Sequence, residues 1–223
     1  MLAQALAVLE KDLRLDWRSR GRALAVLLFG VVTLLLFSFA VGPDTQALRQ
    51  HAAGYLWLAL MLSSVMALQE SFRLELEDDA LEGLQLLPVD PRALFYGKAS
   101  ANVLFLLTLG IVLLPVTLGL FDAELKGSPL LLLGSLGLGV AGLAGPGTLY
   151  AAMTSRARGR DVMLPLLLFP LVVPVLLASV KASALALLGD PMDQGRSWLV
   201  LVLCFDLVYW SVCGILFGKV MDS

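Results

Sequence analysis

The sequence predicts an all-α, polytopic membrane protein with six spanning helices. Hydrophobic residues make up 59% of the chain and charged residues only 15%, against roughly 45–50% and 25% in a soluble domain. The hydrophobic residues gather in six runs of about twenty, the length that an α-helix needs to cross about 30 Å of hydrocarbon. These runs use most of the 223 residues. We therefore expect one permease-like membrane domain over residues 1–223 and no soluble catalytic domain.

The six predicted spans follow one another with short connections. The first and third are uninterrupted, whereas the fourth and fifth contain Gly and Pro. Membrane helices tolerate both residues when neighbouring helices satisfy the backbone. The predicted bounds are 23–41, 52–68, 99–120, 129–153, 162–180 and 198–217.

Basic residues predict the orientation of the spans, because Lys and Arg in short connections mark the cytoplasmic side. Twelve lie in the two terminal segments and in the connections after spans two and four: Lys11, Arg14, Arg18, Arg20, Arg22, Arg73, Arg92, Lys98, Arg156, Arg158, Arg160 and Lys219. The other connections hold four: Arg49, Lys126, Lys181 and Arg196. We therefore expect a multi-pass protein with both termini in the cytoplasm.

Residues 1–22 predict an interfacial amphipathic helix. Its apolar stripe consists of Leu2, Leu6, Leu9, Leu13 and Trp17, and its opposite, basic face of Lys11, Arg14 and Arg18. This pattern is typical of a helix that lies in the cytoplasmic interface. Residues 19–22 should break the helix before the first span. A basic anchor that only orients this span is the alternative interpretation.

The longest connection, residues 69–98, predicts an amphipathic helix with an acidic face. Its apolar face consists of Phe72, Leu76, Ala80, Leu84 and Leu87, and its acidic face of Glu75, Asp78, Asp79 and Glu82. The inner leaflet is itself negative, and acids one turn apart repel each other. A protein partner with a basic groove would remove this cost. We therefore predict a docking helix over Glu75–Leu87 that ends at Pro88, with an ordinary solvated face as the alternative.

Residues 181–197 are too short to span and are predicted to form an outer-side loop. This segment is rich in Ala, Leu and Gly. It could form a short surface helix or a re-entrant helix, and the sequence leaves both open.

Spans four and five contain features that shape helices. Gly137, Ala141 and Gly145 repeat at every fourth position, a pattern that lets helix backbones approach closely. Gly145-Pro146-Gly147 is expected to bend or interrupt span four. Span five contains the hinge candidates Pro165, Pro170 and Pro174. Each removes a backbone hydrogen bond, and the three either let the bundle flex or only set a static curve.

Two polar residues near or inside the spans are candidates for function. Asp206 is the only acid within a predicted span, and intramembrane acids are functional more often than other residues. A hydrogen-bonded structural role is the alternative. His51, the only histidine, could ligate a metal or heme iron or be an ordinary solvated side chain. Cys204 and Cys213 are expected to be packing residues.

Motifs for common enzyme chemistry are missing from the sequence. It contains no Gly-x-x-x-x-Gly-Lys-[Ser/Thr] for ATP, no His-Glu-x-x-His and no Cys-x-x-Cys. One histidine at the outer side supports no Ser/His/Asp set. We therefore expect no catalytic residues, no metal site, no identifiable cofactor-binding residue and no enzyme activity.

Four stretches of the sequence resemble the CcmB family, the heme exporter permease of cytochrome c maturation. They are residues 39–43, 54–60, 69–88 and 164–175, and the third is the most specific. The resemblance implies an ABC-2-type permease in the bacterial inner membrane, paired with a cytoplasmic ABC ATPase subunit that hydrolyses the ATP. It also implies other cytochrome c maturation subunits as partners, a homodimer within the complex and heme as a possible substrate. The acidic helix would then be the coupling helix, contacting the ATPase through Glu75, Asp78, Asp79, Glu82 and Leu84.

Three functions follow from this resemblance and the absent motifs. The first is a subunit that carries heme outward, and the second is a coupling subunit that passes ATPase motion to a neighbouring heme-handling protein. The third is a permease for another substrate, while an intramembrane enzyme lacks a catalytic set. We expect contact with membrane lipid and no nucleic-acid partner.

Overall fold

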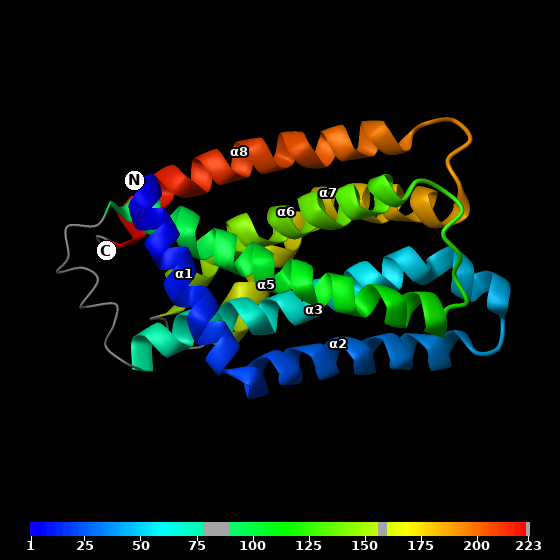
Figure 1. Ribbon diagram of the computed structural model, residues 1–223, viewed down its shortest axis with the longest axis horizontal. Helices are drawn as coiled ribbons and strands as arrows, with labels where there is room; N and C mark the ends of the chain where they lie inside the picture. Colours follow the sequence, from blue (N-terminus) through cyan, green and yellow to red (C-terminus); the bar gives the residue numbers. More distant parts are fainter. Residues whose placement is uncertain (78–89, 156–159, 222–223) are drawn as a thin grey trace.

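A computed structural model describes residues 1–77, 90–155 and 160–221 (Figure 1). Over these residues six helices are long and apolar enough to cross a membrane. A shorter helix, α1 (Leu2–Arg18), precedes them. The six are α2 (Arg20–Val41), α3 (Thr45–Glu77), α5 (Pro91–Leu120), α6 (Pro129–Ser155), α7 (Arg160–Leu188) and α8 (Gly195–Met221). The all-α fold with six predicted spans is confirmed.

The six long helices run side by side, and α1 lies across one end of them (Figure 1). Both termini lie at this end, which we call the terminal end; the opposite end is the loop end. Helix α6 contacts α3, α5, α7 and α8, so it forms the centre of the bundle. Its glycines let the neighbouring side chains reach its backbone.

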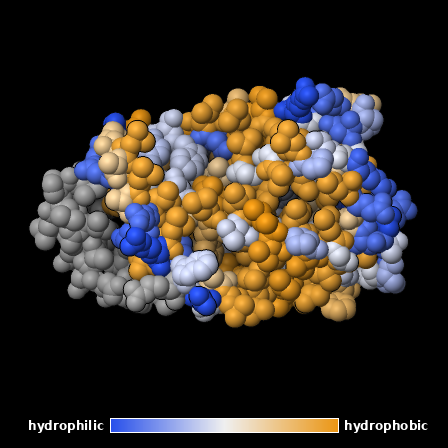
Figure 2. Space-filling model, in the orientation of Figure 1, coloured by the Kyte–Doolittle hydropathy of each residue, from blue (hydrophilic) through white to orange (hydrophobic). Residues whose placement is uncertain are grey.

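The face of the bundle seen in Figure 2 has a broad hydrophobic band, with hydrophilic side chains gathered toward its two ends. Large apolar side chains are exposed along the helices, among them Leu36, Ile111 and Leu207. Such a continuous apolar surface is unfavourable in water but matches lipid chains. The band therefore faces the membrane.

Three of the helices begin behind an aspartate that caps them. The carboxylate of Asp44 accepts backbone N–H groups at the start of α3. Asp90 does the same for α5, and Asp190 for α8. Pro91 follows Asp90 at the first position of α5, where its missing N–H costs nothing. These short polar signals set the ends of long apolar helices.

Helix α7 is longer than predicted, and this corrects the outer-side loop at 181–197. Residues 181–188 continue α7 without a break, and α8 begins at Gly195. Ala182, Ser183 and Ala186 are buried on the inner side while Lys181 is exposed, so this stretch keeps a helical periodicity. Its end is anchored because the N–H of Gly127 donates to the carbonyl of Ala186 at 2.8 Å. Only the short turn before α8 connects the two spans.

Helix α6 also departs from the prediction. It continues through Gly145-Pro146-Gly147 to Ser155, so the expected interruption is wrong. Of the predicted small-residue stripe, Gly137 faces open space, whereas a Cβ atom on Gly145 would lie 2.8 Å from Nε1 of Trp210. The glycines that admit neighbouring side chains are Gly139, Gly142, Gly145 and Gly147.

The predicted connection at 69–98 is mostly helical where the structure describes it. Helix α3 continues to Glu77, and α5 begins at Pro91. Glu75 lies in the last turn of α3. Four of the predicted coupling residues, Asp78, Asp79, Glu82 and Leu84, lie outside the described residues.

Candidate functional site

Helix α1 crosses α5 in direct backbone contact. A Cβ atom on Gly97 would lie 2.6 Å from the carbonyl oxygen of Ala5 and 2.8 Å from the Cβ of Val8. Only glycine permits this approach without a shift of α1. Val8 and Asp12 are one turn apart and both are buried. The crossing therefore carries a carboxylate into the interior of the protein.

This carboxylate meets a buried lysine. Nζ of Lys98 on α5 lies 3.3 Å from Oδ2 of Asp12, and the two residues are 1% and 7% exposed. The same ammonium lies 4.6 Å from the centre of the Phe72 ring on α3, and Lys11 lies 3.1 Å from the second oxygen of Asp12. Buried charges persist only when they are paired, because each loses several kcal/mol of hydration. One charge pair therefore joins α1, α3 and α5.

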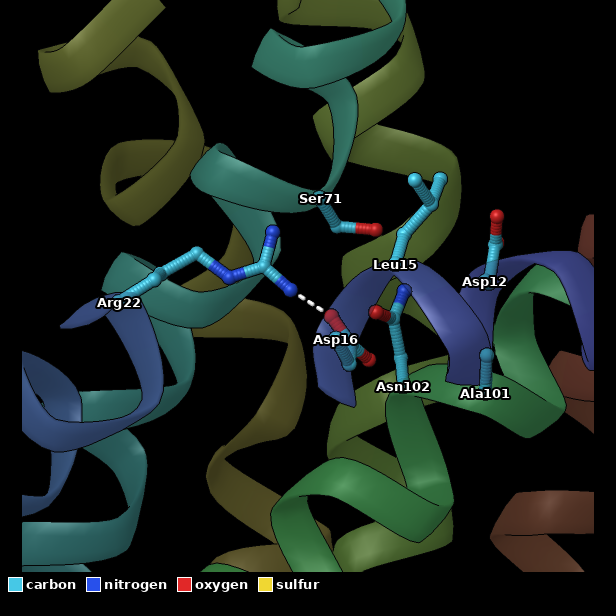
Figure 3. A pocket seen from close by; sticks show the side chains of 7 residues that line it. All are labelled: Asp12, Leu15, Asp16, Arg22, Ser71, Ala101 and Asn102. Atoms are coloured by element: carbon cyan, nitrogen blue, oxygen red, sulfur yellow. Dashed lines mark ion pairs between the residues drawn. The ribbon is translucent and has the colours of Figure 1, made fainter. Parts of the chain in front are cut away.

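A second ion pair connects α1 to α2. Asp16 pairs with Arg22 (Figure 3) across the break at Ser19, where α1 ends. Arg22 is also within electrostatic range of Glu70 on α3, and its guanidinium carbon lies 5.9 Å from the centre of the Phe105 ring on α5. The pair therefore holds the turn between α1 and α2 against the two neighbouring helices.

Asp12 and the Asp16–Arg22 pair line a small cavity of about 20 Å³ (Figure 3). It is lined by Asp12, Leu15, Asp16, Arg22, Ser71, Ala101 and Asn102. A space of this size holds about one water molecule, so it cannot admit a porphyrin. The amide of Asn102 donates to Oγ1 of Thr148 on α6 at 2.9 Å, which extends the polar contacts to the centre of the bundle.

We call Asp12, Asp16, Arg22, Lys98 and Asn102, with the ring of Phe72, the charged cluster. It joins α1 to the helices on both sides of the undescribed stretch 78–89, since Phe72 lies in α3 before it and Lys98 in α5 after it. A displacement of either flanking helix would change the environment of a buried ion pair. The charged cluster therefore connects α1 with both of these helices.

A larger groove lies beside the charged cluster, between α1, α2 and α5. Its volume is about 730 Å³, within the range of ligand pockets. Its lining is mostly apolar, with Asp16, Trp17 and Arg20 among the polar or amphipathic members. The described lining residues include no His, Cys, Met or Tyr, the side chains that ligate heme iron. The full set is Leu13, Asp16, Trp17, Arg20, Ala23, Leu24, Leu27, Leu104, Phe105, Thr108, Leu109 and Val112.

The polar residues predicted from the sequence lie apart from the charged cluster. Asp206 is buried on α8, and neither of its carboxylate oxygens has a hydrogen-bond partner within the described ranges. His51 is exposed near the start of α3, with its ring 6.0 Å from that of Tyr55. The described residues contain no group of three His, Cys, Asp or Glu side chains that could hold a metal ion.

The hinge candidates lie within a helix that continues through all three. Helix α7 contains Pro165, Pro170 and Pro174, of which Pro170 and Pro174 are on the exposed side. Their role as hinges stays a prediction.

The Asp12–Lys98 pair was not predicted from the sequence. The apolar stripe of residues 1–22 predicted an interfacial helix, and Lys98 entered only as one of the basic residues that predict the orientation. In the structure most of this stripe points outward, with Leu2 83% and Trp17 76% exposed, while the other side of α1 packs on α5. Two signals could have indicated this contact: an acid one turn after Val8, and a glycine directly before a lysine at the edge of a span.

Comparisons with known proteins agree over almost the whole chain. The family model described as CcmB protein matches residues 3–219. Heme exporter protein B of Pseudomonas aeruginosa is 31% identical over 192 residues, which cover 86% of each chain. The protein of the same name from Rhodobacter capsulatus is 36% identical over 174 residues, 77% of this chain and 78% of the relative. That of Escherichia coli K12 is 30% identical over 186 residues, 82% of each.

Proposed function

Because this chain belongs to the CcmB protein family, we propose that it is a membrane subunit of the heme export system for c-type cytochrome biogenesis. Its six apolar helices make it a multi-pass protein of the inner membrane. The chain has no nucleotide-binding motif, so the ATP would be hydrolysed by a partner ABC ATPase. The active unit would contain two copies of the chain and two ATPase subunits, together with other maturation subunits.

The charged cluster is the observation that supports a coupling role. The ATPase would dock on the acidic helix predicted at Glu75–Leu87, whose first residues lie in the last turn of α3 and which precedes α5. A push on this segment would move Phe72 and Lys98 relative to Asp12 on α1. Separation of a buried ion pair is costly, because each desolvated charge loses its partner. The cluster would therefore pass the movement to α1 and, through Asp16 and Arg22, to α2.

We place the terminal end in the cytoplasm because of the twelve-to-four distribution of Lys and Arg. This placement puts the predicted coupling helix on the side where ATP is available. A reporter enzyme fused after Ser223 should be active only in the cytoplasm. Activity only outside the cell would overturn the orientation.

Two versions of this function differ in whether heme passes through the subunit itself. The groove between α1, α2 and α5 is large enough for a ligand, but its described lining offers no iron ligand. The lack of an iron ligand favours the version in which this chain is a coupling subunit that acts on a neighbouring heme-handling protein. Heme bound in the groove through its apolar face, with a carboxylate at Arg20, is the competing version.

Charge reversal of the acidic helix tests the coupling role. The triple variant Asp78→Lys, Asp79→Lys and Glu82→Lys should lose association with the ATPase and lower holocytochrome c in cells, while its abundance in the membrane stays normal. The matched control reverses Glu124 and Asp193, two exposed acids of the loop end. Normal complex formation and normal holocytochrome levels in the triple variant would refute the assignment.

Heme quantitation separates the two versions. The purified complex, with and without Leu109→Trp to fill the groove, is titrated with heme and assayed for ATP hydrolysis. Loss of heme binding in the variant would support passage through this subunit. Unchanged heme binding with normal ATPase activity would support the coupling version.

A further inference from the structure

Asp206 lies near the middle of α8 and is buried. It is eleven residues from Gly195 at the start of the helix, which corresponds to roughly 16 Å along the axis. The residue is 7% exposed, and both carboxylate oxygens are fully buried with no hydrogen-bond donor in the described part of the chain. A carboxylate in this position would be a charge in a low-dielectric medium with nothing to stabilise it.

The groups that face Asp206 do not compensate a negative charge. On α6 it lies against Gly142, and on α7 beside Val175, since a Cβ atom on Gly142 would meet both side chains. On α8 the titratable neighbours are Tyr209 and Cys213, which carry no positive charge.

The carboxyl group lies directly against the backbone of α6. A Cβ atom on Gly142 would lie 2.8 Å from Oδ1 of Asp206. One turn further along α8, Nε1 of Trp210 donates to the carbonyl oxygen of Ala141 at 3.0 Å. Helix α8 therefore already makes one hydrogen bond to an α6 carbonyl beside this position.

The carbonyl of Gly142 lacks its usual donor. In an α-helix this carbonyl accepts from the N–H four residues later, and that residue in α6 is Pro146. Proline has no N–H, so this carbonyl has no donor at the usual position in its own helix. The carboxyl group of Asp206, itself without a donor among the described residues, contacts the same glycine.

We propose that Asp206 is a proton-binding site whose bound proton forms a hydrogen bond to the carbonyl oxygen of Gly142. The carboxylate takes up a proton from hydronium in the solvent, releasing water, and the resulting carboxyl group is neutral, so no charge is buried. The O–H group then donates to the acceptor that Pro146 leaves free. One proton satisfies both buried groups and links α8 to α6 beside the Trp210 contact.

Substitutions at Asp206 separate this role from that of a carboxylate. Asp206→Asn keeps a donor and adds no charge, so it should keep the apparent Tm of the purified protein. Asp206→Leu removes the donor and should lower the Tm by about 2–4 °C. In infrared spectra at pH 7 the wild type should show the C=O stretching band of a protonated carboxyl group, which shifts in D₂O and is missing in Asp206→Asn.

A double-mutant cycle tests the acceptor. Pro146→Ala supplies an N–H to the Gly142 carbonyl, so Asp206→Leu should lower the Tm less in that background. Pro115→Ala in α5 is the matched control and should leave the effect of Asp206→Leu unchanged. The proposal is wrong if the infrared band is absent, if Asp206→Asn lowers the Tm as much as Asp206→Leu, or if Pro146→Ala does not reduce the effect. The infrared result and Asp206→Asn decide the question even if Asp206→Leu does not fold.

Discussion

Asp12 and Asp206 are buried to the same extent, yet their surroundings differ completely. Asp12 lies at the terminal end with Lys98 and Lys11 beside it. Asp206 lies at mid-helix against a glycine, with no cation among its described neighbours. The first site keeps a charge by pairing it, and the second, on our proposal, removes the charge by binding a proton. The location of a buried acid therefore does not define its chemistry; its partner does.

This difference has a consequence for mechanism. An ion pair responds to the movement of either partner, because its energy depends on the distance between two charges. A neutral hydrogen bond between two helices is less sensitive to electrostatics and holds them together. We therefore expect motion at the terminal end and a fixed α6–α8 contact in the centre of the bundle.

The largest loss of stability is expected when the ammonium group of Lys98 is removed from the charged cluster. Lys98→Met leaves Asp12 buried with only the half-exposed Lys11, and breaking a buried pair from one side costs roughly 3–5 kcal/mol. The membrane abundance and thermal stability of this variant should fall strongly. Lys181→Met, at an exposed lysine of α7, is the control and should behave like the wild type. Equal stability of the two variants would show that the pair is not buried in the membrane-bound protein.

A smaller loss of stability is expected for Asp12→Asn. The amide oxygen can still accept a hydrogen bond from Lys98, so part of the interaction remains and the cost should be about 1.5–3 kcal/mol, less than that of removing one partner altogether. The same chemical change at Asp206 should cost little, because there the native group is proposed to be neutral. Thermal unfolding of both variants in one detergent gives the comparison. A larger loss for Asp206→Asn than for Asp12→Asn would reverse the roles of the two sites.

Gly97→Ala probes the crossing that brings Asp12 to Lys98. The new methyl group would meet the backbone of α1 at 2.6 Å, and forced overpacking costs about 1–3 kcal/mol. Gly119→Ala in the same helix has open space around it and serves as the control. Loss of coupled ATPase activity should follow only from the change at Gly97. If both alanine variants keep stability and activity, α1 does not need this close contact.

The smallest change in stability is expected for the double variant that combines Asp12→Leu with Lys98→Met. Replacing both members of a buried pair by apolar residues of similar size is often neutral. Thermal stability should return close to that of the wild type, whereas coupling to the ATPase should stay impaired. A fully active double variant would mean that the charges serve folding only and carry no signal.

The spans could be predicted because each depends on local composition. A run of about twenty apolar residues crosses the membrane regardless of its neighbours, and the structure has a spanning helix for each predicted run. The ends were less predictable, since the extension of α7 to Leu188 depends on a backbone contact with Gly127, sixty residues earlier in the chain.

The charged cluster was beyond prediction because it depends on long-range pairing. Lys98 and Asp12 are 86 residues apart, and their meeting follows from the α1–α5 crossing at Gly97. Asp206 was found as a candidate because a lone acid in an apolar run is visible in the sequence. The acceptor at Gly142 was not, since it requires knowing which residue of α6 lies opposite.

Helix α3 makes a hydrogen bond to α7 at a point away from the middle of its length. Its 33 residues contain no proline, so it extends over about 50 Å without a proline kink. The buried indole of Trp57 donates to Ser183 on α7, roughly 18 Å along the axis from the loop end of α3 and 30 Å from its terminal end. If α3 tilts about this point, its terminal end moves almost twice as far as its loop end. Helix α3 would then act as a lever, with its longer arm leading to the predicted ATPase contact.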